Sequence, residues 1–368
     1  MEDIRHPDLT PQARLAAASA RALVIMLILA AVPPALGAQE KLGDISYLEG
    51  EVAIARDGTS IDGVAIGQDL QNFDQVTTGS DSRAELDLSS GDVPKMTVKV
   101  GADTQFSLEI TSLSGSRQTT LSIMGGSLSM KVAKLSGGQA VQVKTDSTTM
   151  GVRGTDFVVT TPPSGDVLVT CDEGEVVCTD AQGKELRAIP GTVVEQRPDE
   201  LFRTVAVSTA DLDGFRSRWS AERLQNLEQN ALARIRVNAA LYDRLVRELN
   251  QEYAELIRGQ AILDKWMSED RQGRIGQRRE LARERRTIGT LLPRLRRTQF
   301  QLERVTFRLA RLARIRDRGF GAGSLPGGIT TDQFFQRVQT ERPEVQRKLA
   351  LTRYVTKMYG KRNEGQLP

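Results

Sequence analysis

The spacing of apolar residues changes once along this chain of 368 residues, near residue 209. From Lys41 to about Val207, apolar and polar residues alternate in short runs that are separated by glycine or aspartate. Alternation is typical of half-buried strands, and short strands at this spacing predict a sandwich, a barrel or a β-solenoid. Beyond residue 213 the apolar residues recur every three or four positions, as on one face of a helix. The sequence therefore predicts a multi-domain chain, with an all-β domain at residues 39–208 followed by an all-α region.

The two regions carry opposite net charge. Residues 39–210 contain 14 Lys and Arg against 25 Asp and Glu, a net of −11, whereas residues 211–318 contain 25 against 15, a net of +10. Valine, threonine, serine and glycine dominate the first region, and leucine, arginine, glutamine and alanine dominate the second. This is the contrast expected between a β domain and long helices.

The helical region contains two periodic runs that are separated by a break at residues 268–276, SEDRQGRIG. The second run is close to a heptad pattern, and Pro293 is expected to kink it. Arms of about 45–55 residues at about 1.5 Å per residue would reach on the order of 70–80 Å, and we expect them to project from the β domain. The predicted parts are a long antiparallel helical hairpin or coiled coil at 209–318, a flexible Gly-rich linker at 319–329 and C-terminal helices at 330–368.

The second arm is strongly basic, because residues 274–318 contain 15 Arg and Lys against 4 acids. A solvated helix face would account for this, but the excess of arginine also suggests an anionic partner. Candidates are another envelope protein, a cell-wall polymer, lipid head groups or the acidic β domain of this or another copy, which would give a homo-oligomer. Nucleic acid is not expected for an exported chain. The arginines expected to bind the partner are Arg283, Arg285, Arg286, Arg294, Arg296 and Arg297.

Residues 1–38 have the pattern of a secretory signal peptide. A polar front with three arginines precedes an uncharged run at residues 22–38, which is interrupted by Pro33 and Pro34 and ends in small residues. Cleavage near Ala38 would release the protein into the periplasm or the medium. The alternative is an uncleaved signal anchor in the inner membrane.

The residue inventory does not favour catalysis. His6 is the single histidine and lies in the expected signal peptide, so the mature chain would have no imidazole for a triad, a proton shuttle or a typical zinc site. The sequence has no phosphate-binding loop, Cys-x-x-Cys pair or His-Glu-x-x-His motif. We therefore expect no catalytic residue, no metal and no cofactor. A glycan-acting envelope enzyme with paired carboxylates is a further alternative.

Two stretches of the β region echo each other, YLEGEVAIARDGTSIDGVAIGQ and TCDEGEVVCTDAQGKELRAIPG, and predict two equivalent β-hairpin units. The segment LSIMGGSLSM predicts a third hairpin that turns at Gly125 and Gly126. Cys171 and Cys178 flank the first turn of the second stretch, where strand pairing would make them diagonal neighbours on one face. Either a disulfide or two buried free thiols is expected, because two sulfurs without histidine are too few for a metal site.

A glycine-flanked arginine stands between two β-prone runs in TTMGVRGTDFVV, residues 148–159. The glycines would allow a bulge or a positive φ, while the apolar residues would form the buried face of a strand. We expect the guanidinium to bridge backbone carbonyls that a β corner leaves unpaired, with ligand contact as the alternative. The residues of this motif are Gly151, Val152, Arg153, Gly154, Thr155 and Phe157.

This motif, followed by VLVTCDEGEVVC, resembles the end of the FecR domain, a periplasmic module known from iron-transport signalling regulators. The resemblance extends from Gly43 through DQVTTGSDSRAELDL and VKVGADTQFSL to about Glu195. It implies a compact all-β unit, a sandwich or β-solenoid of short strands and hairpins, that senses or binds and does not catalyse.

We therefore expect an exported, non-enzymatic envelope protein. Its FecR-like domain would bind a ligand or partner, and its basic helical arm would serve assembly or anchoring. The alternative is the periplasmic part of a FecR-type signal-transduction system that controls a sigma factor. Such regulators have a cytoplasmic helical segment before their membrane span, whereas this chain has only about twenty residues before its apolar run.

Overall fold

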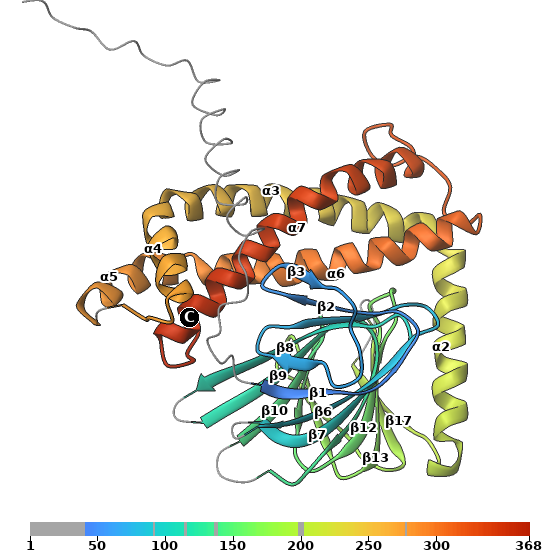
Figure 1. Ribbon diagram of the computed structural model, residues 1–368. Helices are drawn as coiled ribbons and strands as arrows, with labels where there is room; N and C mark the ends of the chain where they lie inside the picture. The colour runs from blue at the N-terminus through green and yellow to red at the C-terminus, as the bar shows by residue number, and fades with distance from the viewer. Residues whose placement is uncertain (1–40, 91–92, 114–115, 136–138, 198–201, 277) are drawn as a thin grey trace, which may run out of the picture.

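The computed structural model describes residues 41–90, 93–113, 116–135, 139–197, 202–276 and 278–368. The predicted signal peptide lies outside the described residues. Figure 1 shows a strand-rich N-terminal part beside a layer of helices from the C-terminal part of the chain. The last strand ends at Ala206 and the first α-helix begins at Leu212, so the change from β to α structure that the apolar spacing predicts is confirmed.

The strands form two sheets, which we call sheet A and sheet B. Neighbouring strands pair antiparallel, except that β10 runs parallel to β9. In order across sheet A they are β4 (Asp69–Gln71), β1 (Lys41–Glu49), β6 (Arg83–Ser90), β7 (Val93–Val100), the second half of β9 (Ser116–Val132), β12 (Asp156–Thr161), β13 (Val167–Glu173), β16 (Thr192–Gln196) and β17 (Arg203–Ala206). In order across sheet B they are β3 (Thr59–Ile61), β2 (Val52–Arg56), β5 (Gln75–Thr78), β8 (Gln105–Leu113), the first half of β9, β10 (Gln139–Lys144), β11 (Thr148–Val152), β14 (Val176–Asp180) and β15 (Glu185–Ala188).

One apolar core joins the two sheets. Ile45 and Phe157 from sheet A and Ile54, Phe106 and Met150 from sheet B belong to the same buried cluster, and each is 0% exposed. Burying a side chain of this size stabilises the fold by roughly 1.5–3 kcal/mol relative to leaving it in water. The alternation of apolar and polar residues is thus explained by strands that each turn one face to this core.

Strand β9 passes from sheet B to sheet A and bends at Gly125 and Gly126. Its first half pairs with β8 up to Gly125, and its second half pairs with β7 and β12 from Gly126 onward. Gly126 has a φ of +106°, and a Cβ at this position would lie 2.2 Å from the hydroxyl oxygen of Thr104. The prediction of a third hairpin at the glycine pair is therefore wrong, because the glycines bend one continuous strand instead of reversing the chain.

The two echoing stretches do form equivalent units. Strands β2 and β3 pair as one antiparallel hairpin and β14 and β15 as another, as predicted. The turn that precedes each hairpin does not pair its two flanking strands. It carries the chain from sheet A to sheet B, from β1 to β2 in one unit and from β13 to β14 in the other. Gly50 and Gly174 stand at these crossings with φ of +75° and +86°, a conformation that favours glycine.

Six α-helices and one 3₁₀ turn are described after the last strand. The longest helix begins with a capping box, in which the Thr330 hydroxyl accepts from the backbone N–H of Gln333 and the Gln333 side chain accepts from the backbone N–H of Thr330. In chain order the elements are η1 (Thr209–Asp211), α2 (Leu212–Gln229), α3 (Ala231–Arg258), α4 (Gln260–Arg271), α5 (Arg278–Gly289), α6 (Leu292–Asp317) and α7 (Thr331–Arg362).

Helices α3 and α6 lie side by side and antiparallel, as the predicted hairpin requires. Arg294 near the start of α6 pairs with Glu255 near the end of α3 at 2.7 Å, and Arg318 just after α6 pairs with Glu228 just before α3 at 2.7 Å. The hairpin is shorter than predicted, because the chain breaks between α2 and α3, between α3 and α4, and between α5 and α6. Helix α7 shares a core with α3 and α6, so the region is a three-helix layer, and a coiled coil is not confirmed.

The helical layer packs against the β domain, so the predicted projection of the arm is wrong. Helix α6 lies on the outer face of sheet B, where a Cβ on Gly125 would be 2.1 Å from the ring of Phe307. Arg296 also pairs with Glu109 of β8 at 2.7 Å. Surface ion pairs alone would hold the arm weakly, at about 0–1 kcal/mol each, but aromatic side chains that dock on the sheets add apolar contact.

Helix α2 covers the other side of the β domain. Its Leu212 and Trp219 share a cluster with Leu168 of β13 and Val193 of β16. The indole nitrogen of Trp219 donates to the carboxylate of Glu195 at 2.8 Å. The β domain is therefore held between α2 beside sheet A and α6 on sheet B (Figure 1).

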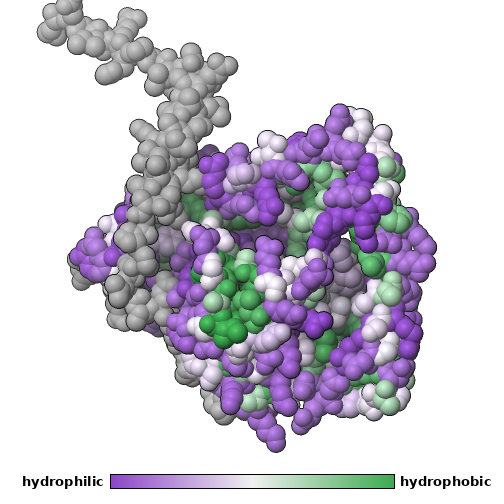
Figure 2. Space-filling view, turned by 45° about the vertical axis from the view of Figure 1, so that its right-hand side comes forward, coloured by the Kyte–Doolittle hydropathy of each residue, from purple (hydrophilic) through white to green (hydrophobic). Residues whose placement is uncertain are grey.

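No helix in the described part of the chain is both long enough and apolar enough to cross a membrane. Figure 2 shows that hydrophilic residues cover most of the surface in that view, with apolar residues in separate patches.

Candidate functional site

A cleft of about 470 Å³ lies between the helical layer and sheet B, and we call it the α6–α7 cleft. It is bounded by α6, α7, one residue of α3, strand β5 and the turn between β7 and β8. Its volume falls in the range of ligand pockets, roughly 300–1,000 Å³. The apolar side chains that line it are Tyr242, Phe307, Leu309, Phe335, Val338, Val345 and Leu349.

Small side chains on α6 leave room for the cleft. Ala310 and Ala313 follow Phe307 at intervals of three residues, which puts all three on neighbouring turns of one helix side. On the facing helix, Val338 and Val345 are seven residues apart, or two turns. The cleft thus lies between two rows of side chains. On α6 the row is Phe307, Ala310 and Ala313, and on α7 it is Val338 and Val345.

A buried polar network forms one wall of the cleft. Glu303 is 5% exposed, and its Oε1 accepts from Nη2 of Arg353 at 2.6 Å and from Nε2 of Gln299 at 2.9 Å. Its Oε2 accepts from Nε2 of Gln75 at 3.3 Å. A buried carboxylate has to be paired and hydrogen-bonded to be tolerated. These contacts link β5, α6 and α7, so the network is a structural joint between the β domain and the helices.

The opposite end of the cleft carries an excess of positive charge. Arg311 and Arg314 both pair with Asp103, Arg314 at 3.0 Å, so two guanidinium groups share one carboxylate. Burial, with a smaller contribution from the charge of Arg314, lowers the pKa of Arg311. Arg342 of α7 lines the same cleft and is exposed. Asp317 lines the same end and is exposed, so three arginines face two carboxylates, and a negatively charged group that entered here would find one unbalanced positive charge.

Thr306 also lines the cleft, but its hydroxyl is buried and has no hydrogen-bond partner among the described residues. Buried polar groups normally have partners, so this hydroxyl is an exception. Across the described ranges no three His, Cys, Asp or Glu side chains are grouped so that they could hold a metal ion.

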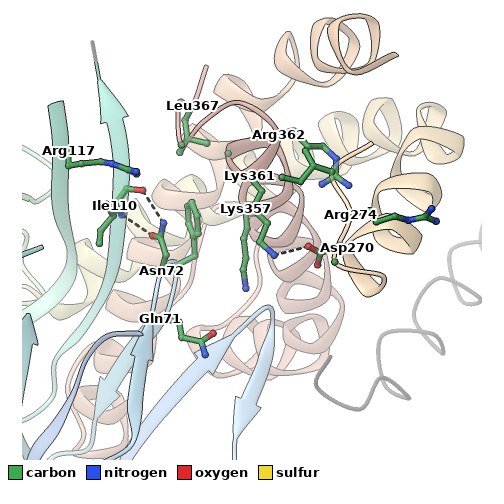
Figure 3. A pocket seen from close by; sticks show the side chains of 15 residues that line it. Gln71, Asn72, Ile110, Arg117, Asp270, Arg274, Lys357, Lys361, Arg362 and Leu367 are labelled. Carbon is green, nitrogen blue, oxygen red and sulfur yellow. Dashed lines mark hydrogen bonds and ion pairs between the residues drawn. The ribbon is translucent and has the colours of Figure 1, made fainter. Parts of the chain in front are cut away.

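A second cavity of about 440 Å³ lies where the C-terminal end of α7 meets the β domain (Figure 3). Its Lys357 pairs with Asp57 at 2.7 Å, and its Lys361 pairs with Asp270 at 2.7 Å. Because carboxylates within the chain already bind these cations, we assign the cavity to the junction between the two parts and favour the α6–α7 cleft as the functional site.

The motif of the glycine-flanked arginine forms the corner between β11 and β12. Val152 and Phe157 are buried and Gly154 has a φ of +62°, as predicted, whereas Gly151 stays within β11. Thr155 is also buried. Arg153 is exposed, and no hydrogen bond or ion pair of its side chain is found within the described residues. The prediction that Arg153 bridges buried carbonyls is therefore wrong, because the strands on either side already pair in their ladders.

The two cysteines are buried and free. Cys171 lies on β13 of sheet A opposite Phe157, and Cys178 lies on β14 of sheet B opposite Met150. The structure thus corresponds to two buried free thiols, the second of the two expected alternatives, and not to a disulfide. Burial raises the pKa of the Cys171 thiol to about 11 and that of Cys178 to about 12, which keeps both protonated at neutral pH.

The six arginines expected to face an anionic partner divide into two groups. Three make contacts within the chain. Arg285 donates to the side chain of Asn363 at 2.7 Å, Arg294 pairs with Glu255 and Arg296 pairs with Glu109. The other three, Arg283, Arg286 and Arg297, are exposed, and no contact of their side chains is found within the described residues. An anionic partner stays a prediction, and none of the six lines the α6–α7 cleft.

Sequence reasoning did not identify the polar residues of the cleft. Gln75 and Glu303 are 228 residues apart, and Gln75 and Arg353 are 278 apart, so no local spacing connects them. The signal that was available was weaker. Glu303 is the one glutamate of a long basic helix and has Phe300 and Phe307 one turn away on either side, which is compatible with a buried carboxylate that needs a cation.

Residues 74–177 match the family model described as FecR protein. The chain therefore contains a FecR domain, as the motif around Arg153 predicts, and the match lies inside the wider resemblance from Gly43 to about Glu195.

Two solved structures are similar to part of the chain, and both are described as a "putative anti-sigma factor" from Parabacteroides distasonis ATCC 8503. One, at 2.50 Å resolution, has 14% identity and a TM-score of 0.31 and matches 38% of this chain and 62% of its own. The other, at 1.65 Å, has 15% identity and a TM-score of 0.32 and matches 38% and 63%. The matched part thus spans less than two thirds of those chains. No curated protein matches this chain.

Proposed function

We propose that this chain is a FecR-type regulatory protein of the cell envelope that acts by binding a partner protein in the α6–α7 cleft and not by catalysis. The FecR domain supports the regulatory class, which is the alternative that the sequence left open beside a general binding protein. The observation that carries the proposal is the position of the cleft. It is built jointly by the FecR domain and the helical layer, so one bound segment contacts both parts.

The lining indicates the chemistry of the segment that would bind. The apolar side chains of α6 and α7 favour aliphatic or aromatic residues. At one end Arg311, Arg314 and Arg342 outnumber Asp103 and Asp317 by one charge, which favours an acidic residue there. We therefore propose an acidic, amphipathic segment of another envelope protein. Export of this chain by its N-terminal signal is part of the same proposal.

Site-specific photocross-linking in living cells tests this function. A benzoylphenylalanine at Gln346, which lines the cleft and is exposed, should join the chain to one partner protein. The same probe at Thr340, which is exposed on the same helix but does not line the cleft, is the matched control. Arg342→Glu should abolish the cross-link and should reproduce the change in gene expression that deletion of the protein causes. Equal cross-linking from both positions, or unaltered gene expression after deletion, would contradict the proposal.

A further inference from the structure

The loop between α4 and α5 forms a basic tip at one end of the helical layer. We call it the α4–α5 tip and define it by Arg271, Arg274, Ile275, Arg283 and Arg286. All five side chains are exposed. In Figure 1 the tip lies at the end of the layer away from α2. Figure 3 shows Arg274 pointing away from the neighbouring cavity. Glycines with positive φ at 273 and 276 turn the chain sharply on both sides of the apolar residue.

The arginines of the tip are not neutralised by carboxylates. Arg271 donates to the backbone oxygen of Met267 at 3.2 Å and Arg274 to the side chain of Gln272, both of which are neutral acceptors. Arg283 and Arg286 make no contact that is found within the described residues. The tip therefore presents four arginines to solvent, none of which pairs with a carboxylate in the described residues.

The nearby acids are already engaged elsewhere. Glu280 and Glu284 both accept from the ammonium group of Lys265, at 2.5 and 2.7 Å. Glu284 also accepts from the indole nitrogen of Trp266 at 2.8 Å. Burial would raise the pKa of the Glu284 carboxyl, but these hydrogen bonds outweigh it and lower the pKa, so this carboxylate stays ionised and bound. Two carboxylates thus share one ammonium group, which leaves one negative charge near the four arginines of the tip.

An exposed aliphatic side chain lies next to one of these arginines, where it also lines the second cavity. Ile275 is 52% exposed at the turn of the loop, with Arg274 beside it in sequence. A soluble polyanion would gain from the arginines but not from the isoleucine, since it offers no apolar phase. A lipid bilayer with anionic head groups offers both, because arginine binds the head groups while an aliphatic side chain enters the interface.

We propose that the α4–α5 tip docks on an anionic lipid surface, with the arginines on the head groups and Ile275 inserted between them. This surface is separate from the α6–α7 cleft, so it adds a membrane contact to the proposed regulatory function. The membrane proposal can therefore be disproved while the proposed function of the cleft still holds. Each basic residue near such a surface increases the partitioning of a protein from water to the membrane by about fivefold. Bound in this way, the protein would lie on the membrane with the tip of its helical layer toward the lipid.

Vesicle co-sedimentation of the full chain is the test, with phosphatidylcholine vesicles compared with vesicles that also contain phosphatidylglycerol. Only the anionic vesicles should bind the protein. Arg283→Gln together with Arg286→Gln should lower partitioning by about 30-fold. The matched control is Arg83→Gln together with Arg153→Gln, which removes the same charge from exposed arginines of the β domain and should leave binding unchanged.

Ile275→Ser separates a lipid surface from other polyanions. It should reduce binding severalfold at high salt, where the charge contribution is screened, and leave the melting temperature unchanged. Equal binding by both double variants would overturn the proposal. Unchanged vesicle binding by Ile275→Ser, together with equally tight binding of the wild type to soluble polyphosphate, would also overturn it in favour of a polyanion surface.

Discussion

Replacing Glu195 should loosen helix α2 from the β domain. The Glu195 carboxylate is 2% exposed and accepts from Trp219 at 2.8 Å, from Arg197 at 2.8 Å and from Arg203 at 2.8 Å. Glu195→Ala leaves the buried indole N–H of Trp219 without an acceptor, which costs about 1–3 kcal/mol. The two arginines can turn toward water, so each loses only about 0–1 kcal/mol. Together these losses lower the free energy of unfolding by about 1–5 kcal/mol.

Urea unfolding followed by tryptophan fluorescence measures this loss, because Trp219 is one of two tryptophans in the chain. Glu195→Gln keeps an acceptor for the indole and should lose about half as much as Glu195→Ala. Glu175→Ala removes an exposed carboxylate that pairs with Arg187 and should stay within about 0.5 kcal/mol of wild type. If Glu195→Ala unfolded at the same urea concentration as wild type, the reasoning about α2 would be refuted.

The pH dependence of this difference follows from the same contacts. Burial would raise the pKa of the Glu195 carboxyl, but hydrogen bonds from Trp219, Arg203 and Arg197 outweigh it, so the pKa lies below the ordinary carboxyl value of 4.5. A carboxylate with a lowered folded pKa adds stability above its unfolded value and loses it as the pH falls through the folded one. The stability difference between wild type and Glu195→Gln should therefore be full at neutral pH and shrink below about pH 4.5.

Three further outcomes are expected. Gly125→Ala should destabilise the protein by about 1–3 kcal/mol, because the new Cβ meets an aromatic ring of α6. Gly151→Ala has room for its Cβ and should cost less than about 1 kcal/mol. Equal urea midpoints for the two variants would contradict this expectation. Arg153→Ala should melt within a few degrees of wild type, since the side chain is exposed and makes no contact within the described residues; a loss above about 2 kcal/mol would restore its structural role. Cys171 and Cys178 should react with a thiol reagent only after unfolding, without prior reduction, and failure to label in denaturant would reveal a disulfide.

The sequence predicted the change from strands to helices because each region has one clear apolar period. It also identified the FecR domain, whose motif is local in sequence. Hairpins were predicted correctly where the turn and both strands are adjacent, as in β2–β3 and β14–β15. The same logic failed at Gly125 and Gly126, since a glycine pair permits both a reversal and a bend, and only the pairing of β9 with strands of two sheets decides between them.

The position of the helical layer could not be read from local patterns. Charge separation along the chain suggested either projection or folding back, and the decisive contacts join residues that are far apart in sequence. Phe307 meets Gly125, and Trp219 meets Glu195. An aromatic residue on an amphipathic helix does not reveal which surface it will cover. For the same reason the α6–α7 cleft, which exists only because α6 lies on sheet B, had no signature in the sequence.

Zero-length carbodiimide cross-linking of the full chain, read by peptide mass spectrometry of the monomer, tests most directly whether the helical layer rests on the FecR domain. Lys357 of α7 and Asp57 at the β2–β3 turn are 2.7 Å apart and should be joined. Lys361 and Asp270, also 2.7 Å apart but both in the helical layer, provide the internal control. The account predicts both cross-linked peptides. Recovery of the Lys361–Asp270 peptide without the Lys357–Asp57 peptide would contradict it and would return the helical layer to a projecting arm.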